Sequence, residues 1–125
     1  MQYLLIIYAE EKKMASMPES EIGKIVAEFN AYSKSIVESG NFVAGGRLQP
    51  TSNATTVRVR EGKTLTTHGP FAETREQLGG YYLVEAKDLD EATKLAARIP
   101  GAQVGSIEVR PVMQLPPDYP RPTAR

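Results

Sequence analysis

The chain has 125 residues, a length that suits one domain with a modest hydrophobic core. Its 15 Lys and Arg balance its 15 Asp and Glu, and it has no long basic run, so a dedicated nucleic-acid surface is not expected. The absence of cysteine excludes disulfides, thiolate nucleophiles and cysteine metal sites. The N-terminus lacks a basic leader, and no apolar run approaches the ~20 residues that span a membrane. We therefore expect a cytoplasmic protein with no membrane contact.

The first third of the chain predicts a strand followed by a long helix. Residues 3–9 are apolar at both odd and even positions (in both parities), which indicates a strand buried on both faces. Residues 10–16 are polar and predict a loop. Ser16 and Glu19 have capping-box spacing, so a helix is expected over roughly residues 17–39. Its apolar stripe comprises Ile22, Ile25, Val26, Phe29, Tyr32, Ile36 and Val37.

The middle of the chain predicts a second strand and a hairpin. Residues 42–49 form the strand, and Gly45-Gly46 within it favours either a bulge or a close approach of backbone to a ligand beside Arg47. Residues 56–60 and 63–67 predict a hairpin closed by a two-residue turn.

The last third predicts a strand, a helix, a strand and a tail. Residues 80–87 are again apolar in both parities, and Asp88 is a good N-cap for a helix that ends near Ile99. Residues 106–112 alternate apolar and polar side chains, which predicts a half-buried strand. Residues 114–125 are rich in proline and without periodicity, so they are expected to form an extended tail.

The order of these elements predicts an α+β fold. It is a ferredoxin-like βαββαβ arrangement with a hairpin inserted before the third core strand, and its natural form is an antiparallel sheet with both helices on one face. Residues 1–113 then form a single domain, followed by the tail.

The two-faced strands also predict assembly. Two helices cover only one side of a four-stranded sheet, yet the strands at 3–9 and 80–86 are apolar on both sides. Soluble monomers rarely leave so large an apolar patch in water. A homodimer that packs sheet against sheet across a two-fold axis would cover it.

The chain is organised around the stretch from residue 67 to residue 82. It contains the only histidine, His68, directly before Gly69-Pro70, which should form a rigid turn. Phe71 is expected to anchor the loop in the core, and the charged residues 73–76 are expected to form a helical turn. Two glycines, Gly79-Gly80, are expected to lead into the next strand.

The same stretch resembles a known signature. Residues 68–82, with the sequence HGPFAETREQLGGYY, resemble the signature of the DGPF-domain proteins, a branch of the YCII-related family. The resemblance continues over residues 3–8, 56–60 and 109–112. It implies a ferredoxin-like fold that assembles as a dimeric α+β barrel, in a family mostly of unknown function. Some relatives look like small enzymes acting on ring compounds, and others are linked to sigma factors.

One position departs from the family pattern. The signature normally begins with Asp, where this chain has His68. An activity that requires a carboxylate at this position is therefore not implied for this chain. Distant YCII relatives are proposed to use a His–Asp pair with the histidine on the first helix, and the first predicted long helix here has no histidine.

The candidate site residues follow from side-chain chemistry. His68 could act as a general acid or base, or it could hydrogen-bond the backbone of its turn. Glu73 could orient His68, and Arg47 or Arg75 could hold an anionic substrate, because guanidinium binds carboxylates through a planar fork. These charged residues could equally form solvated surface ion pairs. Tyr81 and Tyr82 are expected in the core, but one hydroxyl could reach a pocket, and Tyr82 is the candidate for binding a substrate in this way.

The sequence leaves the function open between two classes. No residues in the sequence have the spacing of metal ligands, and no glycine-rich phosphate-binding loop is present. We therefore expect neither a metal nor a cofactor. One hypothesis is a cleft that binds a small polar or aromatic molecule, with proton transfer in an isomerase- or lyase-like reaction. The alternative is a non-enzymatic ligand-binding or regulatory module associated with transcription.

Overall fold

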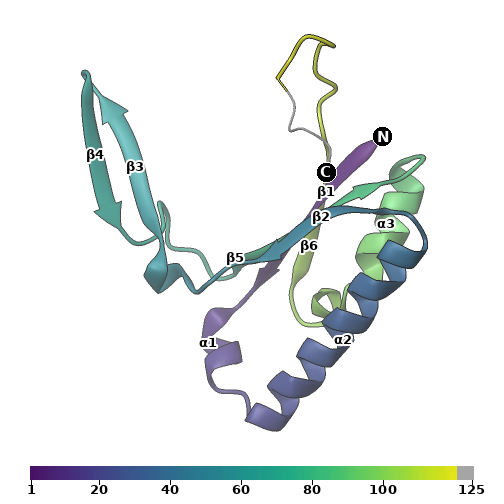
Figure 1. Cartoon of the computed structure of the whole chain (residues 1–125). Helices are drawn as coiled ribbons and strands as arrows, with labels where there is room; N and C mark the ends of the chain where they lie inside the picture. The colour runs from purple at the N-terminus through teal and green to yellow at the C-terminus, as the bar shows by residue number, and fades with distance from the viewer. Residues whose placement is uncertain (121–125) are drawn as a thin grey trace.

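The computed structural model describes residues 1–120. It contains a mixed set of strands and helices, consistent with a ferredoxin-like α+β fold (Figure 1). In chain order they are β1 (Gln2–Ala9), α1 (Glu11–Ala15), α2 (Glu19–Glu38), β2 (Phe42–Arg47), η1 (Thr51–Asn53), β3 (Thr55–Arg60), β4 (Lys63–His68), β5 (Gln77–Glu85), α3 (Leu89–Ala97), η2 (Pro100–Gln103) and β6 (Ser106–Pro111), where η marks a 3-10 helix.

The main sheet has four strands in the order β2-β5-β1-β6, and every neighbouring pair is antiparallel. The first strand therefore lies in the centre, between strands that follow it much later in the chain. Helices α2 and α3 lie on one side of this sheet (Figure 1). The predicted antiparallel sheet with its long helices on one face is confirmed.

The core lies between the sheet and these two helices. Strand pairing places Tyr3 opposite Val84 and Leu5 opposite Tyr82, so all four side chains share the face that meets the helices. Helix α2 contributes Ile36 to this layer, and Leu5, Val84 and Ile36 have no exposed surface. The apolar periodicity of the strands and of α2 thus leads directly to the observed packing.

The opposite face of the sheet, here called the open face, is also apolar at its centre. Leu4 pairs with Leu83 and Ile6 with Tyr81, and these side chains alternate with those of the core. Strand β6 adds charged residues at its edge, since its register places Glu108 opposite Ile6. The open face therefore has an apolar middle along β1 and β5 and a charged margin along β6.

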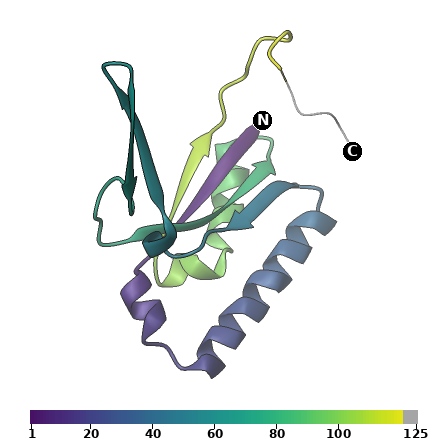
Figure 2. The same cartoon turned by 60° about the vertical axis from the view of Figure 1, so that its left-hand side comes forward.

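Strands β3 and β4 form a separate two-stranded sheet, here called the ribbon, which stands away from the main sheet in both views (Figures 1 and 2). Its register joins Arg60 to Lys63 and Val57 to Thr66. Every residue of β3 and β4 except Thr56 is exposed. The ribbon is attached at its base, where the Gly69 amide donates to the Ala54 carbonyl at 2.7 Å.

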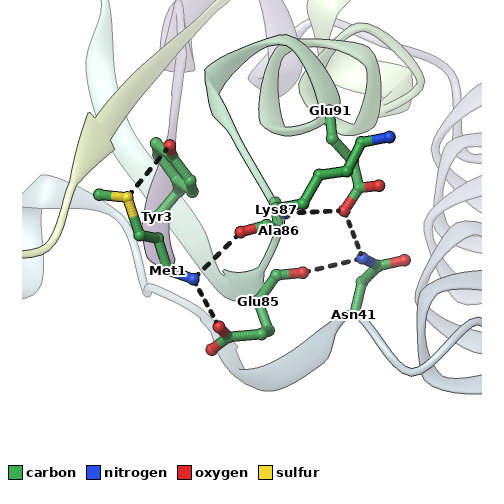
Figure 3. A network of polar contacts seen from close by, with 7 residues as sticks. All are labelled: Met1, Tyr3, Asn41, Glu85, Ala86, Lys87 and Glu91. Atoms are coloured by element: carbon green, nitrogen blue, oxygen red, sulfur yellow. Dashed lines mark hydrogen bonds and ion pairs between the residues drawn. The ribbon is translucent and has the colours of Figure 1, made fainter.

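A polar network closes the end of the fold opposite the ribbon (Figure 3). The N-terminal ammonium of Met1 donates to the Glu85 carboxylate at 2.7 Å and to the Ala86 carbonyl at 3.1 Å. The amide of Asn41, which follows α2, donates to the Glu85 carbonyl at 2.8 Å and to the Glu91 carboxylate at 3.4 Å. This network joins the start of β1, the end of β5, the start of β2 and the first turn of α3.

Three local expectations between β1 and α2 and in β2 were wrong. Residues 10–16 are not a loop, because Glu11–Ala15 forms α1. The capping box of Ser16 does not form, since α2 starts after Pro18 and the Ser16 hydroxyl donates to Lys13 instead. The irregularity of β2 lies between Phe42 and Ala44 and not at the glycine pair.

The segment before β5 also differs from its prediction. Residues 73–76 are not helical, and β5 begins at Gln77, so that both glycines, Gly79-Gly80, lie inside the strand. Phe71 is 79% exposed and does not anchor the loop in the core. A local polar contact holds residues 74–77 in their non-helical conformation, since the Gln77 side chain donates to the Thr74 carbonyl at 2.5 Å.

Two glycine-to-alanine substitutions should act in opposite directions. A Cβ at Gly105 would lie 2.1 Å from the Tyr8 carbonyl oxygen, so Gly105→Ala should lower the free energy of unfolding by about 1–3 kcal/mol. A Cβ at Gly23, on the surface of α2, would meet no atom within 4 Å, so Gly23→Ala should raise it by about 1 kcal/mol. Urea unfolding measures both, and equal effects of the two changes would contradict this packing.

Tyr32 should make stability depend on alkaline pH. Its hydroxyl donates to the Leu95 carbonyl at 2.7 Å, and burial raises its pKa from 10.0 to about 12, partly opposed by the Arg98 guanidinium over its ring. The folded state retains the hydroxyl proton of Tyr32. The contribution of this group to the free energy of unfolding is therefore complete below pH 10.0 and is lost as pH rises through about 12. We expect a loss of roughly 2 kcal/mol relative to Tyr32→Phe. Urea unfolding of the native protein and of Tyr32→Phe between neutral and alkaline pH measures this loss. Parallel pH profiles of the two proteins would contradict the expected role of Tyr32.

Candidate functional site

A cavity of about 580 Å³ lies where the ribbon meets the main sheet, and we call it the His68 cavity. It is lined by residues from several separate segments: Glu11 and Lys12 from α1, Thr51 and Ser52 from η1, His68 at the end of β4, Gly69, Pro70, Ala72, Glu73 and Thr74 of the connecting loop, and Gln77 of β5. Its volume falls within the range of roughly 300–1,000 Å³ typical of small-molecule sites.

The walls of this cavity are fixed by hydrogen bonds between the segments. The Glu11 carboxylate accepts from the backbone amide and the hydroxyl of Thr51, both at 2.9 Å. The Glu11 amide in turn donates to the Gln77 side chain at 2.9 Å. Helix α1, η1 and the start of β5 are thus joined through one glutamate, which is already engaged and acts as a structural residue of the cavity.

Two of the predicted residues, His68 and Glu73, line this cavity together. His68 is the last residue of β4 and lies opposite Thr55. Gly69 follows it with φ +106°, a conformation that other residues rarely adopt, and turns the chain away from the ribbon. Within residues 1–120, neither the His68 ring nor the Glu73 carboxylate hydrogen-bonds another group. Both therefore remain available to a bound molecule.

Lys12 adds a positive charge to the cavity. It is exposed, lines the cavity, and forms no ion pair within the part of the chain that the structure describes. The sequence analysis identified neither Lys12 nor Glu11 as a site residue, and it also missed the helix that carries them. The signal was present: Glu, Lys, Met and Ala, which compose Glu11–Ala15, are all strong helix formers.

The predicted substrate-binding residues lie elsewhere. The Arg75 side chain is 87% exposed and pairs with Glu10 at 3.2 Å, outside the His68 cavity. The Tyr82 hydroxyl forms a 2.6 Å hydrogen bond with the Ser33 hydroxyl. Arg47 and Tyr82 line a different cavity, of about 250 Å³, beside α2. The structure therefore separates the predicted set into a His68–Glu73 pair, an Arg47–Tyr82 pair and an isolated Arg75.

Metal and membrane sites were searched over residues 1–120. No group of three or more His, Cys, Asp or Glu side chains in this range is placed to hold a metal ion. None of the helices in the same range combines the length and apolar character required to cross a membrane.

Comparison with known proteins identifies the family. The model of the YCII-related domain matches residues 1–116. An uncharacterised protein of Rhizobium meliloti (strain 1021) is 37% identical over 114 residues, which cover 90% of this chain and 92% of that protein. The chain therefore belongs to the YCII-related family.

Proposed function

We propose that the His68 cavity binds a small polar or aromatic molecule and that His68 transfers a proton to or from it. The observation that supports this most is the position of the only histidine, in a cavity of about 580 Å³ beside Glu73 and Lys12, with its ring nitrogens unengaged by other described residues. Imidazole is the side chain whose ordinary pKa suits proton transfer near neutral pH.

The three charged or titratable groups have complementary roles in this proposal. The His68 imidazole removes a proton from a carbon next to a carbonyl group and returns it to another atom of the same molecule, so an isomerisation balances without a co-reactant. The Lys12 ammonium stabilises the negative charge that develops on the carbonyl oxygen. Glu73 hydrogen-bonds the imidazole once a ligand is bound, since catalytic hydrogen bonds often tighten only in the complex.

A thermal-shift screen with metabolites tests binding, and the single histidine makes its result specific. A ligand of this cavity should raise the melting temperature, with about 2.7 kcal/mol of stabilisation at a hundredfold excess over its dissociation constant. It should also shift the His68 ring signal in the proton NMR spectrum, which is unambiguous because the chain has one histidine. If no small molecule acts while a protein partner co-purifies, the cavity proposal fails and the regulatory alternative gains support.

A substitution of His68 tests its role in proton transfer separately from ligand binding. His68→Gln retains hydrogen-bonding capacity but cannot transfer a proton, so it should abolish turnover of an identified substrate while changing its binding less than tenfold. Thr66→Gln is the matched control, because Thr66 is exposed on the same face of β4. Full turnover by His68→Gln would exclude His68 as the proton carrier.

We further propose that the protein is a homodimer that packs open face against open face. The support is the apolar centre of the open face, which the helices do not cover: Leu4, Tyr81 and Leu83 are partly exposed there, around Ile6, which is 9% exposed. The ribbon adds a second surface in need of a partner, since Val57 and Val59 are 60% and 59% exposed. Two-stranded hairpins are marginally stable alone in water, so packing against a second copy would stabilise it.

Light scattering tests this assembly. The native protein and Leu89→Glu, a change at an exposed site on α3, should both give the mass of a dimer. Leu83→Glu places the same charge in the centre of the open face and should give a monomer, because an unpaired buried charge costs several kcal/mol. A stable monomer mass for the native protein at micromolar concentration would contradict the proposal.

A further inference from the structure

Helix α2 packs closely against the sheet along only its second half. Its buried residues are Tyr32 and Ile36, whereas Ile25 and Phe29, which come earlier on the same stripe, are only partly buried. The part of the helix before Tyr32 therefore presents apolar side chains that the core does not fully cover.

Two adjoining cavities lie beside this part of α2, and we call them together the α2 groove. One has a volume of about 250 Å³ and reaches Tyr82, and the other has about 280 Å³ and reaches Met14 of α1. Both are lined by Ile7, Phe29 and Arg47, so these three residues mark where the cavities meet. Each volume lies near the lower limit of roughly 300 Å³ for ligand sites, which indicates a small ligand.

Glycine keeps the inner part of this groove open. A Cβ at Gly45 would lie 3.1 Å from Cδ1 of Tyr82 and 3.3 Å from Cε2 of Phe42, so any side chain there would crowd both rings. The two rings are in edge contact, with centroids 6.5 Å apart. Tyr82 itself is buried, and the absence of a side chain at Gly45 lets the groove extend as far as its ring, where a flat apolar group can contact it.

Arg47 supplies the charge. It is exposed at the junction of the two cavities, and no carboxylate among residues 1–120 forms an ion pair with it. The acidic residue that shares the groove, Glu11, already accepts two hydrogen bonds from Thr51. A guanidinium with its donors free, next to apolar walls, is the arrangement that binds a carboxylate attached to an apolar body.

We propose that the α2 groove is a binding site for a small carboxylic acid with an aromatic body. The carboxylate binds Arg47, and the ring lies against Phe29 and Ile7 with its far edge toward Tyr82. This site adjoins the His68 cavity, with which it shares Glu11 and Gln77 as lining residues, but it does not depend on the proton transfer proposed there.

Binding of 3-phenylpropanoate tests the proposal, with 3-phenylpropanamide as the neutral isostere and acetate as the carboxylate without a body. The acid should bind and shift the methyl NMR signals of Ile7 and Ile25, which line the groove. The amide should bind at least tenfold more weakly, and acetate should cause no shift. Equal affinity for acid and amide, shifts confined to the His68 ring, or no binding of the acid at millimolar concentration would each overturn the proposal.

Two pairs of variants separate charge from shape. Arg47→Gln should weaken the acid at least tenfold without affecting the amide, whereas Arg58→Gln, the same change on the exposed ribbon, should affect neither. Gly45→Ala should weaken both compounds, and Gly23→Ala, where a Cβ meets nothing, should weaken neither. Unchanged acid binding in Arg47→Gln would show that the guanidinium is not the carboxylate partner.

Discussion

The pairing of β1 with β5 is the contact on which the rest of this structure depends. It brings the first strand next to a segment that starts about 70 residues later, and both strands are apolar in both parities. One parity builds the core beneath α2 and α3, and the other builds the open face. A Cβ at Gly80 would lie 2.8 Å from the Gly46 carbonyl oxygen, so a side chain there would push β2 away from β5. The second glycine of Gly79-Gly80 is thus required by strand spacing.

The register shift in the same pairing also positions the candidate site. It lies between Ile7 and Tyr8 of β1, where the pairing passes over Gly79 and continues with Leu78. Beyond it Gln77 still belongs to β5 but already lines the His68 cavity, where it binds the amide of Glu11. The end of the central strand pair therefore fixes the wall on which α1 and the loop after β4 converge.

The sequence predicted the elements whose signal is periodic. The strands follow from their apolar residue patterns, and the long helices follow from apolar stripes with a period of 3.6 residues. The turn of the ribbon follows from Glu61-Gly62, where both residues have positive φ. It failed where a local signal competed with contacts distant in sequence. The spacing of Ser16 and Glu19 fits a capping box, yet the chain enters α2 through Pro18. Phe71 is the most hydrophobic residue of its loop, yet its ring is left in water, while a polar contact of Gln77 holds residues 74–77.

The residues of the candidate site also divide into those that the sequence could identify and those that only the fold brings together. His68 was identified because a lone histidine before a Gly-Pro turn is visible in the sequence, and its cavity partner Glu73 lies only five residues away. Glu11 and Lys12 could not be found by spacing, since they reach the cavity from more than 50 residues earlier in the chain. Only the fold reveals that Arg75 is engaged by Glu10 while Arg47 is not.

The two candidate sites differ in how they relate to assembly. Strand pairing places His68 on the same face of the ribbon as Val57, Val59, Thr64 and Thr66. A partner that covered the exposed valines would therefore lie on the same face of the ribbon as His68. The α2 groove lies on the helix side of the sheet, where Phe29 and Ile7 border the core. Of the four apolar residues at the centre of the open face, Tyr81 alone also lines this groove, so a partner that covered the open face would meet the groove at that residue.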